Sequence, residues 1–344
     1  MKGDRLRRRL LEGMVIPAHP LALTVDRRLD ERRQRALSRY YIAAGAGGLA
    51  VAVHTTQFAI RRPEYGMFRP ALELAAEAAR EADQPPVLIT GVCGDTAQAV
   101  SEAETAAGLG YDAALVSLGA LRDASEAYLV EHCRAVGDVL PIIGFYLQPA
   151  VGGRILSRSF WRRLCDLDSL AAIKVAPFNR YQTLDVLHAV ADSGRADEIA
   201  LYTGNDDHII GDLITSVTIR GQSLRFHGGL LGQWSFGTRR AVELLRITKE
   251  VQAQGTAPLS LIEMDVHLTD LNSALFDAAN GFRGCIAGIH EALRRQGLME
   301  HILCLDPEET LSEGQAAEIE RVLDAYPHLH DQSFIKQHRD TWLT

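Results

Sequence analysis

The sequence has 344 residues, of which 47% are apolar and 23% are charged, and this length allows one large α/β domain with a helical extension or two ordinary domains. The formal net charge of −8 argues against a nucleic-acid partner, because a nucleic-acid surface needs a basic stripe that displaces the counterions of phosphate. No run of 18 apolar residues occurs, so we expect neither a membrane-spanning helix nor a membrane partner.

The N-terminal segment is basic, with Arg5, Arg7, Arg8 and Arg9 close together. No apolar stretch of signal-peptide length follows it, and we interpret it as an amphipathic helix with a solvated face. The five cysteines are widely spaced and form no C-x-x-C pair. This pattern is typical of reduced thiols and favours a cytoplasmic location.

Short, nearly continuous apolar runs recur along the chain, and such runs are typical of parallel strands covered on both faces. We predict eight strands, at residues 13–19, 47–54, 86–93, 113–118, 141–147, 170–176, 198–204 and 223–228. Segments with helical spacing are found at residues 30–44, 96–109, 124–136, 159–166, 180–191, 206–217 and 234–253.

This alternation predicts an α/β protein with an eightfold β/α barrel, the TIM barrel. A doubly wound sheet is the alternative, but the glycine-rich segment 45–48 precedes a strand, whereas a dinucleotide-binding turn follows one. Amphipathic helices without intervening strands are predicted at 271–279, 285–296 and 312–325. We therefore expect a barrel with an N-terminal helix over residues 1–255, and a C-terminal helical region over residues 256–344 that packs on it.

Lys174 is the residue with the clearest chemical potential. Only four of the 36 basic residues are lysines, and Lys174 lies within an apolar predicted strand. Apolar surroundings lower the pKa of a lysine, and a neutral amine can attack a ketone, whereas arginine stays protonated. Because reactive groups of barrel enzymes lie toward the C-terminal ends of strands, Lys174 is a candidate nucleophile. The alternative is a structural lysine paired with a carboxylate.

Two further features belong with this lysine. Tyr146 lies near the end of the preceding predicted strand, where a phenol can transfer protons. Thr55 and Thr56 follow the second predicted strand, where hydroxyl and N–H groups can hold a carboxylate. Taken singly, the tyrosine is more commonly a core residue and the threonine pair a helix cap.

At this point the chain resembles the dihydrodipicolinate synthase/N-acetylneuraminate lyase family, from about residue 13 to about residue 234. The similar segments, in family order, are 15–20 (VIPAHP), 47–56 (GGLAVAVHTT), 91–96 (GVCGDT), 145–149 (FYLQP), 173–174 (IK) and 202–207 (YTGNDD). They correspond to the opening strand, G-T-T-G-E, G-V-G-x-x-[ST], Y-N-x-P, the Schiff-base I-K and the G-D-D/E turn. Each motif is weak alone, and their common order is specific.

The resemblance implies roles for these residues. Lys174 would form an imine with a 2-oxo acid such as pyruvate, and Tyr146 would transfer protons. Thr55 and Thr56 would bind the substrate carboxylate. The implied activity is that of an aldolase or dehydratase that uses a lysine Schiff base and no added cofactor. The resemblance also implies a homodimer or homotetramer.

Three departures from the family pattern narrow the range of reactions that we expect of this chain. His54 replaces the glycine before the threonine pair, and Val151 stands where lysine-pathway synthases have an arginine, although Arg154 is near. The loop after the fourth strand has Ala120 where those synthases place a relay tyrosine. We infer that the chain is not the lysine-pathway synthase. A different aldehyde, or the dehydration or hydration of a sugar-derived oxo acid, fits better.

The other residues that we assign to substrate binding, at predicted strand ends, are His19, His54, Asn205 and Gly228. A metal held by His19 and His54 with Asp95 or Asp206 is an alternative, but rim histidines more commonly contact substrate or shuttle protons, and we expect no metal. A third possibility is a non-catalytic member that binds an oxo acid as a sensor or partner protein.

Overall fold

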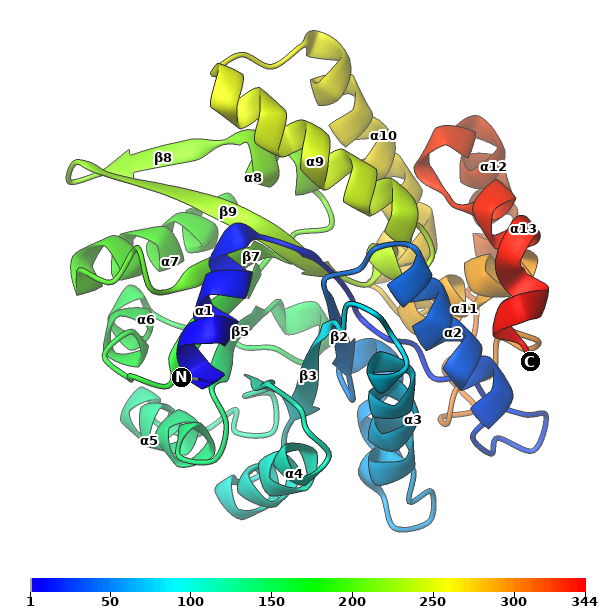
Figure 1. Cartoon of the computed structure of the whole chain (residues 1–344), viewed down its shortest axis with the longest axis horizontal. Helices are drawn as coiled ribbons and strands as arrows, with labels where there is room; N and C mark the ends of the chain where they lie inside the picture. The colour runs from blue at the N-terminus through cyan, green and yellow to red at the C-terminus, as the bar shows by residue number, and fades with distance from the viewer. Residues whose placement is uncertain (1) are drawn as a thin grey trace.

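The computed structural model describes residues 2–344 and contains eight parallel strands closed into a barrel, with helices around it (Figure 1). Neighbouring strands follow the order β1-β9-β7-β6-β5-β4-β3-β2, and a parallel bridge between Ala18 and Ala50 joins the two ends. The barrel strands are β1 (Val15–Pro17), β2 (Gly48–Val51), β3 (Val87–Val92), β4 (Ala113–Val116), β5 (Ile142–Leu147), β6 (Leu170–Ala176), β7 (Ala200–Thr203) and β9 (Gln222–Leu231). The predicted TIM barrel is confirmed.

Helices surround the barrel and also close its ends. The outer ones are α2 (Glu31–Ala43), α3 (Phe68–Arg80), α4 (Thr96–Gly108), α5 (Glu126–Gly137), α6 (Arg158–Leu164), α7 (Arg180–Ser193), α8 (Ile209–Ile214) and α9 (Thr238–Gln254). The remaining helices are α1 (Lys2–Glu12), α10 (Leu259–Leu275), α11 (Cys285–Arg295), α12 (Gln315–Ala325) and α13 (Gln332–Trp342). Within residues 2–344, none of the helices has the length and apolar character needed to cross a bilayer.

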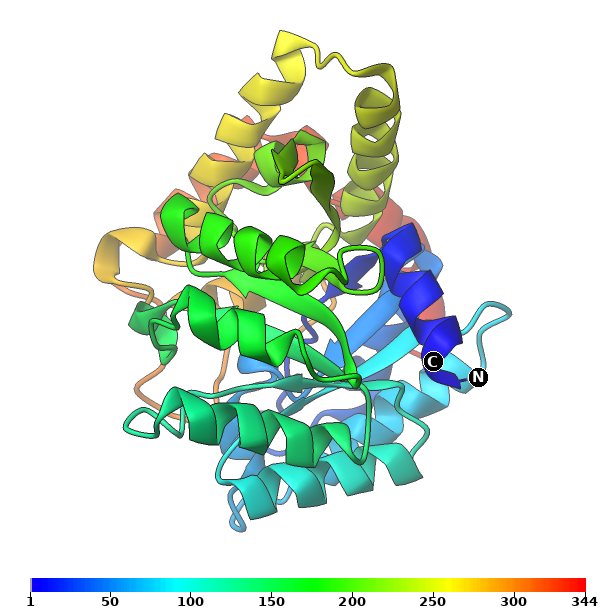
Figure 2. The same cartoon turned by 90° about the vertical axis from the view of Figure 1, so that its left-hand side faces the viewer.

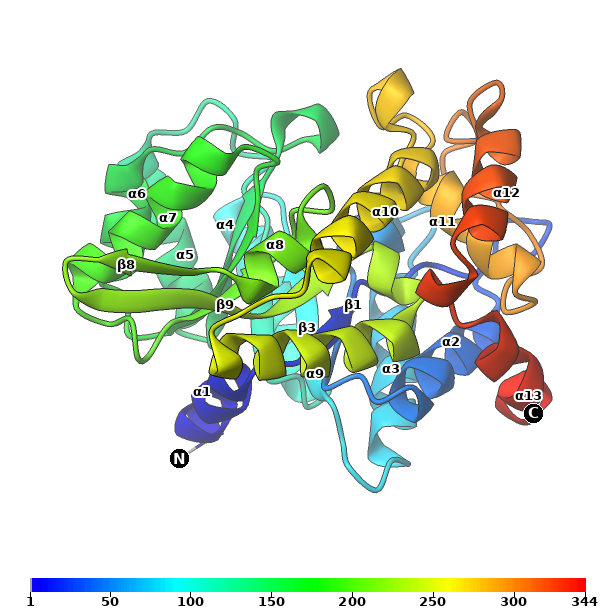
Figure 3. The same ribbon diagram turned by 90° about the horizontal axis from the view of Figure 1, so that it is seen from above.

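The two ends of the barrel are closed by different parts of the chain. The apolar side of α1 packs on the barrel interior at the N-terminal ends of the strands, where Tyr202 donates a hydrogen bond to the Leu10 carbonyl at 2.8 Å. Figure 2 shows α9 and α10 as a helical hairpin, and in Figure 3 α10, α11 and α12 gather on the side of the barrel farther from α1. The C-terminal region from α10 onward consists of helices and loops.

Several element predictions need correction. No helix was assigned between the second and third predicted strands, yet α3 lies there, and its alanine, leucine and glutamate residues are strong helix formers that could have indicated it. The segment 206–217 is not one helix: α8 is short and is followed by β8 (Ser216–Ile219), which forms a hairpin with the start of β9. Helix α10 begins at Leu259, well before the predicted start.

The eighth barrel strand also extends further than predicted, to Leu231. Gly228 therefore lies inside β9 rather than at its end, and it pairs with Tyr202. A Cβ atom at Gly228 would overlap the backbone oxygen of Met14, just before β1. This glycine is required where the two backbones approach closely.

The strands place alternate side chains inside and outside the barrel. In β5, Ile143 and Phe145 belong to the interior cluster, whereas Ile142 and Tyr146 pack in the layer between strands and helices. This alternation determines which side chains can reach a site within the barrel mouth.

The close contact at Gly228 yields a stability prediction. Gly228→Ala should lower the free energy of unfolding by about 1–3 kcal/mol, because the added methyl must displace backbone atoms. Gly108→Ala is the matched control: Gly108 is an exposed helical residue with open space around its Cβ position, and alanine there should leave stability unchanged or raise it by about 0.5–1 kcal/mol. Denaturant unfolding measures both. Equal stability of the two variants would contradict the contact.

Candidate active site

A small cavity of about 70 Å³ lies at the C-terminal ends of the barrel strands. Its lining comes from almost every part of that face: Ala18, Val53, His54, Thr55, Phe145, Leu147, Gln148, Val151, Lys174, Ala176, Phe178, Gly204, Asp206, Gly232, Phe276, Phe282, Cys285 and Ile289. This is the end at which β/α barrels carry their chemistry. The last four residues of the list belong to the C-terminal helical region, which therefore forms part of the site as well as packing on the barrel.

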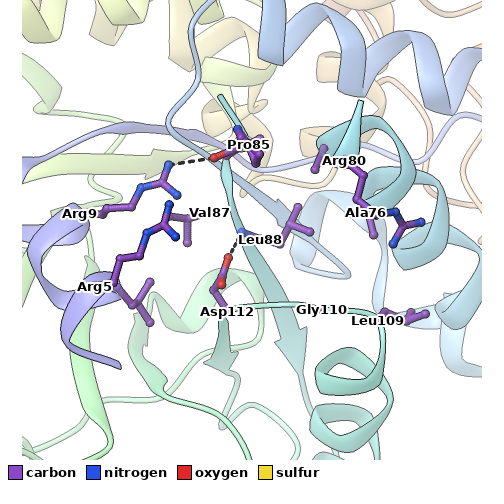
Figure 4. Close-up of a pocket in the computed structure, with 13 residues that line it drawn as sticks. Arg5, Arg9, Ala76, Arg80, Pro85, Val87, Leu88, Leu109, Gly110 and Asp112 are labelled. Carbon is purple, nitrogen blue, oxygen red and sulfur yellow. Dashed lines mark hydrogen bonds between the residues drawn. The ribbon is translucent and has the colours of Figure 1, made fainter. Parts of the chain in front are cut away.

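A larger groove of about 400 Å³ lies at the opposite end of the barrel. Figure 4 shows Arg5 and Arg9 extending into it from α1, with Arg9 donating to the Pro85 carbonyl at 3.1 Å. Asp112 accepts a hydrogen bond from the Leu88 N–H at 3.0 Å. Guanidinium groups stay protonated and supply no nucleophile. The groove therefore lacks a candidate nucleophile of the kind that Lys174 supplies in the small cavity.

Lys174 lies on the interior face of β6, between Ala172 and Ala176. Its Nζ atom is 4.5 Å from the centre of the Phe145 ring on β5. A Cβ atom at Gly204 would come within 2.7 Å of the Lys174 Cε, so the glycine leaves room for the lysine side chain. Burial lowers the pKa of Lys174 well below its ordinary value, and the charge of Asp206 opposes this shift.

Asp206 is the carboxylate that faces this amine. Burial raises the pKa of Asp206 well above its ordinary value, while the Lys174 charge opposes that shift and Asp207 adds to it. The Asp206 carbonyl accepts a hydrogen bond from Asn272 of α10 at 2.7 Å. One carboxylate oxygen of Asp206, Oδ1, is buried and has no hydrogen-bond partner within residues 2–344.

His54 and Thr55 form another side of the cavity, in the short helix η1 (His54–Thr56) directly after β2. Burial and the nearby charge of Lys174 lower the pKa of His54 to about 4, so its imidazole is neutral at pH 7. Thr55 donates a hydrogen bond to the His19 carbonyl at 3.2 Å. Thr56 is fully buried, donates to the same carbonyl at 2.6 Å, and does not line the cavity.

Tyr146, the predicted proton-transfer residue, points away from the cavity. Its side chain is fully buried, and its ring lies 5.1 Å from that of Trp161 on α6. The Tyr146 hydroxyl donates to the Leu156 carbonyl and accepts from the Leu156 N–H, both at 3.3 Å. The aromatic residue of β5 that enters the cavity is Phe145. Sequence reasoning missed this because an almost entirely apolar strand does not reveal which face is inside.

Three of the predicted substrate-binding residues also lie elsewhere. His19 is buried on the α2 side, where Ser38 and Gln34 hydrogen-bond its two ring nitrogens at 2.8 and 3.0 Å. Asn205 hydrogen-bonds Asp212 at 2.9 Å and accepts from the Phe178 N–H at 3.2 Å, which fixes the loop after β7. Gly228 lies within β9, level with Met14 just before β1, and does not line the cavity.

The arrangement does not favour a metal centre. His19 hydrogen-bonds Ser38 of α2 while His54 lines the cavity, and within residues 2–344 no group of three metal-ligating side chains comes together. Cys285, at the start of α11, lines the cavity, but burial raises the pKa of its thiol far above neutrality. All five cysteines are free thiols.

Two groups of cavity residues went unassigned in the sequence. Asp206 was recognised only as an alternative metal ligand, although its place directly after a barrel strand is a usable signal. Cys285 and Ile289 come from α11 and Phe282 from the turn before it, and nothing in a local pattern indicates which face of such a helix covers the barrel mouth.

The fold and the site together define a β/α-barrel protein with a buried lysine amine at its C-terminal face. The sequence model of the dihydrodipicolinate synthetase family matches residues 12–326, and the chain belongs to this family. A curated relative, 4-hydroxy-tetrahydrodipicolinate synthase of Bifidobacterium longum, is 29% identical over 196 residues, which are 56% of this chain and 60% of the relative. The matching enzyme of Clostridium novyi is also 29% identical, over 36% of this chain and 41% of its own length.

Two solved structures show the same fold. YagE of E. coli K12, a prophage protein of the dihydrodipicolinic acid synthase family in complex with pyruvate, superposes with a TM-score of 0.74 at 20% identity, over 91% of this chain and 98% of YagE. The N-acetylneuraminate lyase of Fusobacterium nucleatum complexed with pyruvate has a TM-score of 0.72 at 16% identity, over 92% and 97% of the two chains. The resemblance to this family in the sequence is thus confirmed.

The orientation of Tyr146 can be tested through stability and binding together. Tyr146→Phe should cost about 1–3 kcal/mol of unfolding free energy, because it leaves buried Leu156 backbone groups without their partner. Any binding of pyruvate, the ligand in the two solved structures above, should be the same as in the unsubstituted chain when measured by calorimetry. Tyr181→Phe, at an exposed tyrosine, is the control and should stay within about 0.5 kcal/mol. Normal stability with lost binding would place the phenol in the cavity instead.

Proposed function

We propose that the chain is a lyase, an aldolase or dehydratase, that acts on a 2-oxo acid through an imine at Lys174. The observation that carries this proposal is the buried amine in the cavity at the C-terminal ends of the strands, with its pKa lowered by burial. The two family structures in complex with pyruvate support this substrate class. Because the curated relatives match over only 41% to 60% of their length, the activity is a proposal for this chain.

The cavity has a place for each part of such a substrate. The neutral amine of Lys174 attacks the 2-oxo carbon, and loss of water gives the imine. Thr55 and the neutral imidazole of His54 line the same cavity, where they bind the substrate carboxylate and orient it. When a bond at C3, the carbon next to the imine carbon, then breaks, the cationic imine accepts the electron pair that is released.

We infer that the substrate differs from that of the lysine-pathway synthases. Val151 lines the cavity where the resemblance calls for an arginine. The nearby Arg154 donates instead to the carbonyls of Leu121 and Ala124, at 2.8 and 3.0 Å. Ala120 and Val151 also line an adjoining cavity of about 340 Å³ over the ends of β3 and β4. A group that extends from the imine in this direction meets a mostly uncharged lining, in which Arg122 supplies a positive charge.

The mouth of the main cavity is strongly apolar. Phe178 and Phe282 pack with ring centres 5.8 Å apart, and Phe276 and Ile289 continue this surface. An apolar wall leaves the hydroxyl groups of a sugar-derived chain without partners, which costs binding energy. Of the two substrate types that the sequence suggests, the lining therefore supports a different aldehyde with an apolar substituent over a sugar-derived oxo acid.

The non-catalytic alternative has one observation in its favour, namely that Phe145 occupies the cavity where a proton-transferring tyrosine was expected. Such a protein would bind an oxo acid as a sensor or partner protein without turning it over. The cytoplasmic location and the homodimer or homotetramer remain predictions. Sedimentation velocity of the purified chain measures the second of these.

Reductive trapping tests the proposed function. Borohydride added to the protein with pyruvate should attach one reduced pyruvate to Lys174, located by peptide mass spectrometry, because an imine is reduced to a stable secondary amine. Lys174→Arg should remove the label, and Lys249→Arg, at a lysine on α9, should keep it. Among longer 2-oxo acids, phenylpyruvate should compete better than a polyhydroxylated 2-oxo acid. Binding of these acids without any label at Lys174 would favour the sensor.

The pH dependence of labelling follows from the pKa of Lys174. With the pKa lowered from 10.5, the neutral amine becomes available at lower pH than in free lysine. The rate of imine formation, measured by borohydride quench, should rise with pH and reach half its plateau below pH 10.5. The free side-chain amine of Nα-acetyl-lysine should reach half its plateau at a higher pH. Removing the negative charge in Asp206→Asn should move the midpoint lower still. A midpoint equal to that of N-acetyl-lysine would show that the amine is not desolvated.

A further inference from the structure

The imine chemistry proposed above requires a group that moves protons beside Lys174. Among the described residues that line the cavity, the titratable side chains other than the lysine are His54, Asp206 and Cys285. Tyr146 lies behind the strand with its hydroxyl bonded to Leu156, and Phe145, which is in the cavity, has no proton to give. The proton-transfer residue therefore has to come from a strand end other than that of β5.

The three candidates differ in basicity. The pKa of His54 is lowered to about 4, so that its neutral imidazole is a weak base. The pKa of Cys285 is raised by burial, which keeps its thiol protonated. Burial raises the pKa of Asp206 above that of an ordinary carboxylate, and a general base is most effective when its pKa lies close to the working pH.

The loop after β7 holds Asp206 in place from both sides. On one side, Asn205 is bonded to Thr183, Asp212 and the Phe178 N–H. On the other, Asn272 of α10 donates to the Asp206 carbonyl. These contacts involve the backbone or the neighbouring residue, so the Asp206 carboxylate is free to react, and its Oδ1 atom is buried without a hydrogen-bond partner within residues 2–344.

We propose that Asp206 is the proton-transfer residue of this enzyme and takes the place of the tyrosine used elsewhere in the family. The inference rests on the proposed imine at Lys174 and adds the base that the imine requires. It also assigns the loop after β7 and its anchor on α10 to the reaction.

The proton and electron balance is complete with these groups. In the pyruvate imine, the Asp206 carboxylate removes a proton from C3, and the C–H electron pair forms the C2–C3 double bond of a neutral enamine. In the cleavage direction, the carboxylate takes the proton of the C4 hydroxyl, and the C3–C4 bond breaks to release an aldehyde and the same enamine. The proton then returns to C3, and water hydrolyses the imine to pyruvate and the free amine.

Exchange of the pyruvate methyl protons tests this step separately from imine formation. In D₂O, the wild-type protein should exchange the C3 protons of pyruvate for deuterium, followed by NMR. Asp206→Asn keeps the side-chain shape and should lower the exchange rate by at least a hundredfold, within the range of about 10²–10⁴ that general acid–base groups contribute. With borohydride and a long incubation, the same variant should still label Lys174 to completion.

Matched variants make the outcome decisive. Asp197→Asn removes an equal charge from an exposed residue just before β7 and should exchange like the wild type, as should Tyr146→Phe. Wild-type exchange in Asp206→Asn, or loss of exchange in Tyr146→Phe, would overturn the role of Asp206 and leave the imine standing. A wild-type protein that neither exchanges protons nor labels at Lys174 would overturn the proposed function itself. Exchange in Asp206→Asn should not return on adding metal ions, because the lost group is a base.

Discussion

The site depends on one geometric constraint: in a closed barrel, each strand presents only every second side chain to the interior. In β6 this places Lys174 inside with Ala172 and Ala176, while Ile173 and Val175 pack against the helices. In β5 the same rule brings in Phe145 and turns Tyr146 outward. A shift of one residue would exchange the two sets completely. Which residues reach the site therefore depends on which side of each strand faces the barrel interior. The sequence motif of the strand alone does not determine this.

A lysine amine inside such a barrel is costly to bury as an ammonium ion, and its surroundings offset the cost in two ways. The Phe145 ring lies 4.5 Å from Nζ and favours the cation, as does the Asp206 carboxylate across the cavity. Burial has the opposite effect and dominates, so that the neutral amine becomes accessible. Burial raises the pKa of Asp206 and lowers that of Lys174, while the attraction between the two charges opposes both shifts, and the net effect brings both pKa values toward the pH range in which protons are exchanged.

The sequence allowed the barrel and most of its strands to be predicted, because buried parallel strands are nearly continuous apolar runs. It also allowed Lys174, His54 and Thr55 to be placed at the mouth, since each lies at or near a strand end. It did not reveal the facing of Tyr146 in an apolar strand, nor that His19 turns toward α2 after β1. Asn205 and Gly228 were assigned to substrate binding by position alone. In the structure, Asn205 fixes the loop after β7, and Gly228 leaves room for the Met14 backbone. Contacts between distant segments determine these cases, and no local pattern encodes them.

The C-terminal helical region covers the site. Phe282, Cys285 and Ile289 cover a mouth whose remaining walls come from the barrel, and Asn272 of α10 holds the backbone of Asp206. The barrel alone would leave the amine and the carboxylate exposed to water, where their pKa values would return toward the ordinary ones. The desolvation that prepares Lys174 is therefore produced jointly by the strands and by a region far along the chain. Once this cover is in place, a carboxylate in the loop after β7 is as well situated as a phenol on β5 to exchange protons with an imine on β6, since β5 and β7 both flank β6.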